Sequence, residues 1–164
     1  MLSIDLVKRI SETPDRWDID SRFTYRAAAP GPWDRDKLEQ TLSVVLPDDL
    51  VSLWKCAGRV DLDVQCPIGH WGTVIWDPDQ TTMENMQRGR RIASRPLQAG
   101  DLLIGECLGD GDVVLVRADP KADDFGGVVV LGEDPRHETD TVASSVSQFI
   151  ERCLASPATK FWEQ

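Results

Sequence analysis

The stretch from residue 101 to residue 119 constrains the fold of this chain more than any other. It contains two apolar runs, residues 102–104 and 113–116, separated by a Gly-Asp-Gly-Asp segment. Glycine and aspartate tolerate the backbone angles of tight turns, so the pattern predicts a β-hairpin. Residues 113–116 are all Val or Leu. Because successive side chains of a strand point to opposite faces, this strand is expected inside a sheet that is covered on at least one face.

The acidic turn and the cysteines give no sign of a metal site. A calcium loop needs a D-x-D-x-D-G run followed by a distal Glu, which is missing, so the turn is typical of a solvated hairpin tip. The cysteines are Cys56, Cys66, Cys107 and Cys153, without a C-x-x-C pair or a nearby histidine. We therefore expect reduced and mostly buried thiols, and neither a metal nor a cofactor.

Length and charge limit the classes of function. At 164 residues the chain is long enough for one full hydrophobic core. It has no apolar run of the ~20 residues that a membrane helix needs, and its first residues are too charged for a signal peptide, so we expect a cytoplasmic protein that makes no membrane contact.

The net charge of −10 is concentrated in one region. Residues 101–140 hold eleven acidic and three basic side chains, which is a balance of −8. This acidity disfavours nucleic acid as a ligand and favours a basic protein partner through electrostatic steering. A solubilising face without any partner is the alternative interpretation.

Periodicity predicts the elements of the first half. Residues 3–12 carry a helical apolar stripe that stops before a proline. Residues 13–33 lack periodicity, and we expect a loop-rich arm that lays its aromatic side chains on the core. A helix is expected over residues 34–44, and a second one starts at Pro47, buries an apolar face and ends with Gly58 as a candidate cap.

The second half changes to short strands. Residues 60–64 and 72–76 are expected to begin an antiparallel sheet. Thr81-x-x-Glu84 is a candidate capping box for a helix that runs to about residue 94. A very apolar strand at residues 128–131 and a helix capped by Ser145-x-x-Gln148 complete the chain.

Motifs that carry catalysis are absent from the sequence. It has no G-x-S-x-G elbow, H-E-x-x-H pair, phosphate-binding loop or dinucleotide fingerprint. The two histidines, His70 and His137, lie in polar segments that suit structural or solvent roles. Cys107 follows Glu106, and a neighbouring carboxylate raises a thiol pKa, which argues against a nucleophile. We predict no catalytic residues.

Three landmarks in order resemble the SUKH superfamily, which includes bacterial immunity proteins of polymorphic toxin systems and yeast regulators of cell-wall assembly. They are the LPDDLVSLW helix start with Ala-Gly at 46–58, the hairpin at 104–116, and VASSV with Phe-Ile at 142–150. The resemblance covers about residues 36–154. It implies an α+β fold, with helices packed on a mostly antiparallel sheet, and a non-enzymatic role in binding proteins.

The chain departs from the family pattern in two loops. Ala57-Gly58-Arg59 stands where members often have Asn-Gly-Gly, and the hairpin turn lacks the usual glycines followed by Asn. Residues 1–35 have no counterpart, so we expect an N-terminal helix and arm on a SUKH-like domain of residues 36–164, within one globular unit.

The leading hypothesis is an immunity protein that neutralises a cognate toxin, a basic domain, by direct binding. An intracellular scaffold or regulator without a toxin partner is the alternative, and a small-molecule-binding or hydrolytic enzyme is the weaker one. Aromatic anchors and exposed acidic side chains are the candidates for contact with a protein partner. These candidates are Trp33, Trp71, Trp76, Asp110, Asp112, Asp123 and Asp124.

Overall fold

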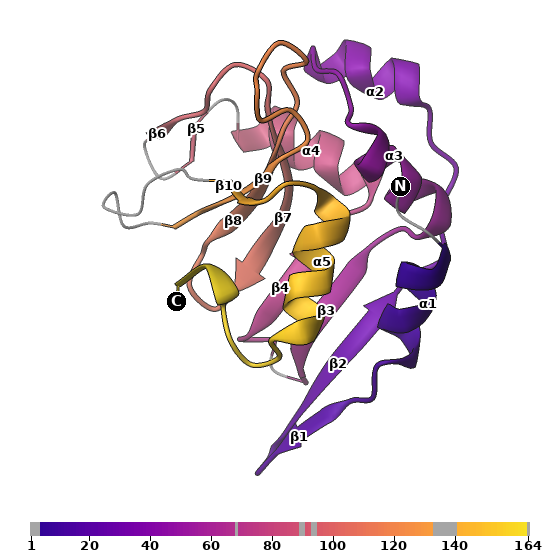
Figure 1. The fold of residues 1–164 in the computed structure, drawn as a ribbon, viewed down its shortest axis with the longest axis vertical. Coiled ribbons are helices and arrows are strands. Elements are labelled where there is room, and N and C mark those ends of the chain that lie inside the picture. Colours follow the sequence, from indigo (N-terminus) through magenta and orange to yellow (C-terminus); the bar gives the residue numbers. More distant parts are fainter. Residues whose placement is uncertain (1–3, 68, 89–90, 93–94, 133–140, 164) are drawn as a thin grey trace.

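One eight-stranded antiparallel sheet forms the centre of the protein (Figure 1). The computed structural model describes residues 4–67, 69–88, 91–92, 95–132 and 141–163. The strand order is β1-β2-β3-β4-β7-β8-β9-β10. The strands are β1 (Arg16–Asp18), β2 (Ser21–Ala27), β3 (Val60–Cys66), β4 (Gly72–Ile75), β7 (Asp101–Leu108), β8 (Val113–Arg117), β9 (Val128–Leu131) and β10 (Thr141–Ala143), with a separate pair of β5 (Arg91–Ile92) and β6 (Arg95–Pro96).

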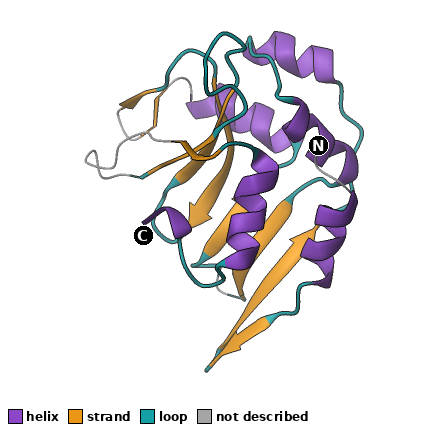
Figure 2. Ribbon diagram, viewed as in Figure 1, coloured by secondary structure: helices purple, strands orange, loops and turns teal. Residues whose placement is uncertain are grey.

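Helices pack against this sheet, which confirms the predicted α+β fold (Figure 2). Helices α1, α3 and α5 contribute to the same large apolar core over one face of the sheet, whereas α4 packs beside β7 and α2 packs on α4. The helices are α1 (Ile4–Glu12), α2 (Arg35–Leu42), α3 (Asp48–Cys56), α4 (Pro78–Arg88), α5 (Val146–Ala155) and the short 3-10 helix η1 (Phe161–Glu163).

Strand β8 is buried on both faces, as its sequence predicts. It pairs with β7 on one side and β9 on the other, so it is an interior strand. Val114 and Val116 join the core under the helices, while Val113 and Leu115 join a second apolar cluster on the opposite face. The alternation follows from the two-residue period of a strand. This pattern fixes the register of the strand, because a slip of one residue would exchange the two faces.

The predicted arm over residues 13–33 is wrong in part, because much of it belongs to the sheet. Strands β1 and β2 form a hairpin, and β2 pairs with β3. The buried Phe23 and Tyr25 do lie in the core, as the aromatic side chains of the arm were expected to do. They reach it from a strand, in which β-branched and aromatic residues are favoured.

Two predicted helix boundaries are also corrected. The Asp77 carboxylate accepts a hydrogen bond from the Gln80 amide at 2.8 Å, so α4 starts one turn before the expected Thr81 box and ends at Arg88. Helix α3 ends at an extended Ala57 rather than at a left-handed Gly58. The cap of α5 is confirmed, since the Ser145 hydroxyl accepts from the Gln148 amide. Strand β10 and helix η1 were not predicted.

Among the helices of the described residues, none combines the length and the apolar character needed to cross a membrane.

Candidate partner-binding surface

A groove between α2 and α4 is a large hollow on the described surface, lined mainly by exposed side chains. It has a volume of about 720 Å³, which lies in the range of ligand and peptide sites. The N-cap Asp34 and positions 37, 38 and 41 of α2 line it, which is the spacing of one helical face. The lining residues are Pro32, Trp33, Asp34, Lys37, Leu38, Thr41, Pro78, Asp79, Thr82, Met83, Met86 and Gln87.

The walls of the α2–α4 groove expose apolar side chains. Met83 is 47% exposed and Met86 is 65% exposed, although both are large hydrophobic residues. Methionine is flexible and polarisable, and it is common on surfaces that adapt to protein partners. Trp33 is half-buried at the entrance, and its ring lies 5.4 Å from that of Trp54 in an edge-to-face contact. The groove therefore combines adaptable side chains with one anchored aromatic ring.

Charged side chains lie at the rim of the groove. Asp34 caps α2, because its carboxylate accepts from the Lys37 amide at 3.1 Å. Asp79 and Lys37 are exposed at the edge. The lining offers apolar contact from its methionines and charge pairing from Lys37, Asp34 and Asp79.

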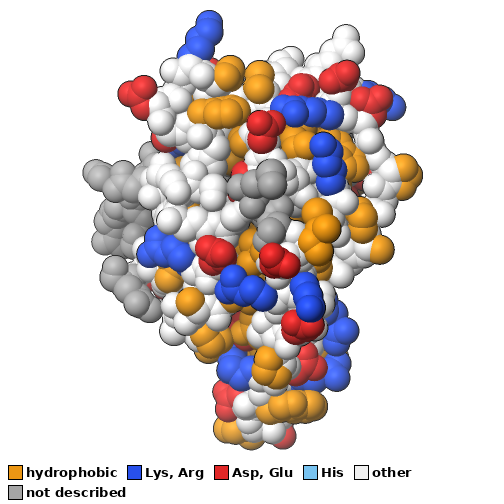
Figure 3. All heavy atoms as spheres, turned by 45° about the vertical axis from the view of Figure 1, so that its right-hand side comes forward, with side chains coloured by type: hydrophobic (Ala, Val, Ile, Leu, Met, Phe, Trp, Pro, Cys, Tyr) orange, Lys and Arg blue, Asp and Glu red, His pale blue; other side chains and the backbone are white. Residues whose placement is uncertain are grey.

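The space-filling view shows how the charges are distributed. In Figure 3, hydrophobic side chains lie between Lys or Arg and Asp or Glu side chains, and both signs are mixed across this face. A mixed surface of this kind does not steer a partner by one dominant field.

The structure separates the three predicted aromatic anchors. Trp33 lines the α2–α4 groove. Trp71 is half-buried beside a different cavity of about 30 Å³, which has room for one or two water molecules and none for a partner side chain. Trp76 is 0% exposed and belongs to the second core cluster. The proposal of Trp76 as a partner contact is therefore corrected, since its ring has no free surface.

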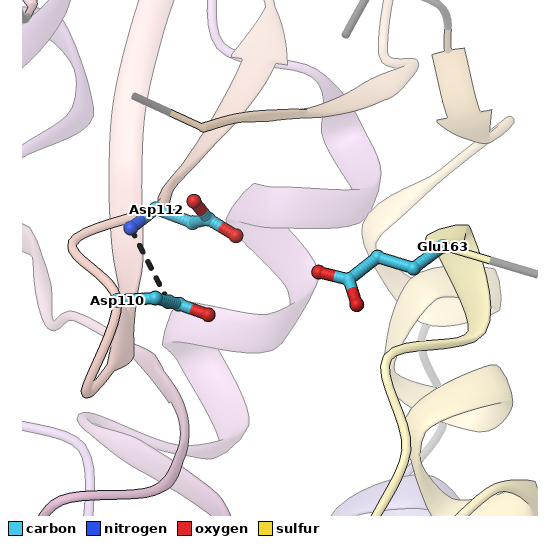
Figure 4. Close-up of side chains that lie close together, drawn as sticks. All are labelled: Asp110, Asp112 and Glu163. Carbon is cyan, nitrogen blue, oxygen red and sulfur yellow. Dashed lines mark hydrogen bonds between the residues drawn. The ribbon is translucent and has the colours of Figure 1, made fainter. Parts of the chain in front are cut away.

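Two of the predicted acidic contacts bind a lysine of the same chain. The side chain of Lys160, only 8% exposed, pairs with Asp110, with Asp112 at 2.7 Å and with Glu163 at 3.4 Å. Figure 4 shows the three carboxylates directed toward a common space from the β7–β8 turn and from η1. Their oxygens lie within 4.8 Å of one another, a spacing that could hold a cation. The Lys160 ammonium supplies that positive charge, and it fastens the C-terminal segment to the hairpin turn.

The other two acidic candidates differ from each other. Asp124 pairs with Arg117 at 3.2 Å, while Arg117 also binds Asp101. Asp123 is exposed and forms no ion pair with the described residues. Asp101 and Glu106 pair with Arg117 and Arg88, and Asp119 is half-buried. The other acidic side chains of the region, together with His137, lie at residues 133–140, outside the described residues. Within residues 101–132, Asp110, Asp123 and Asp124 are exposed, and of these three Asp123 forms no ion pair with a described residue.

The titratable groups with shifted pKa values are structural. Burial raises the pKa of Cys107 to about 12, so the thiol is protonated at neutral pH and is a poor nucleophile. Burial also raises the pKa of Cys153. All four cysteines are free thiols. Burial first, and then the hydrogen bond to Asp63, raise the pKa of Tyr25, whose hydroxyl stays a donor. His70 is exposed.

Sequence reasoning missed Met83 and Met86 as surface residues. The sequence puts both on one face of the helix predicted from Thr81, without showing whether that face is buried or exposed. The helix face that enters the protein instead uses Pro78, Thr81 and Asn85, and the Asn85 amide bonds the backbone of Leu103 at 2.8 and 3.0 Å. Because polar residues of α4, such as Asn85, occupy the inner face of the helix, its methionines face outward.

Comparison with known proteins gives one match that covers most of the chain. Residues 32–152 match the model of the SMI1 / KNR4 family (SUKH-1). This confirms the family expected from the three landmarks, over nearly the same residues. A search among curated proteins gives no match. The matched segment includes both helices of the α2–α4 groove, whereas α1, β1 and β2 precede it.

Proposed function

Because this chain belongs to the SMI1 / KNR4 family (SUKH-1), we propose that it is a non-enzymatic protein-binding domain and, specifically, an immunity protein that neutralises a cognate toxin in the cytoplasm. The family membership is consistent with an immunity or a regulatory protein-binding role. The observation that carries the proposal is the α2–α4 groove, with exposed Met83 and Met86 beside Trp33.

The shape and chemistry of the groove support a protein rather than a small-molecule ligand. Two helices form its walls, and grooves of this kind accept an apolar helix or loop of a partner. Exposed apolar side chains with a polar rim are the usual anatomy of a protein interface. The toxin would place an apolar side chain between the methionines and pair its basic groups with Asp34 and Asp79, both of which line the groove.

Direct contact with nucleic acid and with membranes is not part of the proposal. The chain carries a net charge of −10, and binding phosphates requires a basic surface. The N-terminal residues 1–35 are proposed to be an addition to the family domain, since the match starts at residue 32.

Co-expression with a toxin tests the specific claim. A candidate toxin domain encoded near the gene for this chain is induced in a host cell together with wild-type protein, Met86→Glu or Ile4→Glu. Ile4 is 75% exposed on α1, so Ile4→Glu is the matched control. We expect the wild type and the control to restore growth and Met86→Glu to fail. Toxicity that persists with all three proteins, while a different protein is captured from the native cell, would favour the scaffold alternative.

A further inference from the structure

The β1–β2 hairpin ends in an exposed apolar tip. The two strands are joined by Ile19 and Asp20, since Asp18 lies opposite Ser21 in the register. Ile19 is 97% exposed and Trp17 is 72% exposed. In Figure 1 the tip projects from the body at one end of the long axis, and α2 lies near the other end. Figure 3 shows hydrophobic and acidic side chains together at this lower end. The hairpin precedes the segment that matches the family.

The backbone of Ile19 is strained in a way that its own contacts do not offset. Its φ is 38°, in the left-handed region. A β-branched residue is an outlier there, and a turn of this kind favours Gly, Asn or Asp. The side chain is almost fully exposed, so it contributes no burial energy to the fold. Strain at an exposed position points to a role outside the molecule.

The base of the hairpin holds the tip in place. Arg16 of β1 donates two hydrogen bonds to the Asp63 carboxylate, at 3.3 and 3.0 Å, and its guanidinium lies 3.8 Å from the centre of the Phe23 ring. Tyr25 of β2 donates to the same carboxylate at 2.9 Å. A projecting element fixed at its base loses little conformational entropy when it binds.

The tip carries a net negative charge once the ion pairs within the chain are taken into account. Arg16 is paired with Asp63, and Arg22 lies 3.7 Å from the Asp15 carboxylate and faces the Trp17 ring. Asp18 and Asp20, on either side of Ile19, are exposed and form no ion pair with the described residues. The tip therefore presents Trp17 and Ile19 next to the exposed carboxylates of Asp18 and Asp20.

We infer that the β1–β2 tip is a second docking surface, which inserts Ile19 and Trp17 into an apolar pocket rimmed by Lys or Arg on a protein partner. The inference rests on the proposed function in that the chain binds proteins. It adds a contact that is remote from the α2–α4 groove. The carboxylates of Asp18 and Asp20 select the basic rim by charge complementarity, and the apolar pair supplies the buried anchor.

Site-specific photo-crosslinking in the native cell is the first test. Benzoylphenylalanine is placed at position 19, at position 86 in the groove, or at the exposed control position 4. We expect position 19 to give a protein adduct whose crosslinked peptide contains Lys or Arg, with no such adduct at position 4. An adduct at 86 without one at 19 would overturn the docking tip and leave the proposed function standing. Failure at both 19 and 86 would overturn both.

The purified crosslinked protein is then titrated against full-length variants. Ile19→Gly relieves the backbone strain, so thermal stability should stay equal or rise, while Kd should increase at least fivefold. Asp18→Asn with Asp20→Asn should slow association at low salt by at least threefold. Ile4→Gly is the control and should leave Kd unchanged. A Kd for Ile19→Gly within fivefold of the wild type contradicts the inference, as does an adduct formed only with a second copy of this chain.

Discussion

Replacing Asp63 by Asn is expected to destabilise the protein although the two side chains have the same size. The Asp63 side chain is 10% exposed, and its carboxylate accepts four hydrogen bonds. They come from Arg16 at 3.3 and 3.0 Å, from the Tyr25 hydroxyl at 2.9 Å and from the Ala158 amide at 2.8 Å. Asp63 lies in β3, so its carboxylate connects this strand with β1, with β2 and with the C-terminal segment.

The expected loss of stability follows from the chemistry of the groups that bind the Asp63 carboxylate. Every partner group is a donor, so the NH₂ group of the introduced asparagine would face a donor where an oxygen now accepts. Hydrogen bonds to a charged group contribute about 1.5–3 kcal/mol each. The side chain of Arg16 is 29% exposed and can turn to water, so its share is reduced. We expect Asp63→Asn to lower the free energy of unfolding by about 2–4 kcal/mol.

Asn is the informative replacement because it tolerates the backbone of position 63. The φ of Asp63 is 54°, in the left-handed region, where Asn and Gly are accepted and Ala is strained. Asp63→Gly therefore measures the loss of the whole carboxylate, and Asp63→Ala should cost about 1 kcal/mol more than Gly.

Urea denaturation at pH 7 measures these changes. A double-mutant cycle of Asp63→Gly with Tyr25→Phe should give a coupling energy of at least about 1 kcal/mol, because both changes remove the same hydrogen bond. The reasoning is refuted if Asp63→Asn shifts stability by less than about 1 kcal/mol, or if the two substitutions are additive.

Three further predictions concern stability. Val114→Asp should cost about 3–5 kcal/mol in urea denaturation, because it places an unpaired charge in a strand that is 0% exposed at that position; a loss under about 1 kcal/mol would contradict the interior position of β8. Lys160→Ala removes the ammonium group that now pairs with three carboxylates, so added Ca²⁺ should raise the melting temperature of this variant. The melting temperature of the wild-type protein should not change with Ca²⁺, and equal responses of variant and wild type would refute the prediction. The pKa values of Cys107 and Tyr25 are raised in the native state, so the native protein keeps protons that the unfolded chain releases at high pH. Their contribution to the free energy of unfolding is complete below about pH 8 and is lost as the pH rises through 9 to 12, by up to about 1.4 kcal/mol per pH unit for each group. Denaturant midpoints that stay constant to pH 11 in the presence of a reductant would contradict this prediction.

The central hairpin was predictable because its signals are local. Gly109 and Gly111 adopt φ of 103° and 77° in the turn, and the strands on each side are apolar enough to require burial. The start of α2 near Asp34 and the cap of α5 at Ser145 were predictable for the same reason, since both side chains accept from backbone amides three residues further on.

The β1–β2 hairpin was not predictable from such signals. Its loop is Ile19-Asp20, which contains no glycine or asparagine, and the left-handed residue is the β-branched Ile19. Its anchor is also remote in sequence, because Arg16 and Tyr25 bind Asp63 across about 40 residues. Pairing at this separation depends on the folded sheet and leaves no local pattern.

The candidate site was predictable only in part, because exposure and pairing are tertiary properties. Trp33 and Trp76 look alike in sequence, yet one lines the α2–α4 groove and the other is fully buried. Asp112 and Asp123 are both acidic loop residues, yet one binds Lys160 and the other is exposed. Lys160 lies about 50 residues further along the chain, so sequence position could not reveal the pair.

The affinity of the groove variants for the partner tests the central claim most directly. The protein captured by the wild-type chain is titrated by calorimetry against Met83→Glu, Met86→Glu and the control Ile4→Glu, all exposed hydrophobic positions. If the α2–α4 groove binds the partner, each methionine variant should raise Kd at least tenfold, a loss of about 1.4 kcal/mol, at unchanged thermal stability. The control should bind as the wild type does. Equal affinities for all four proteins would contradict the account.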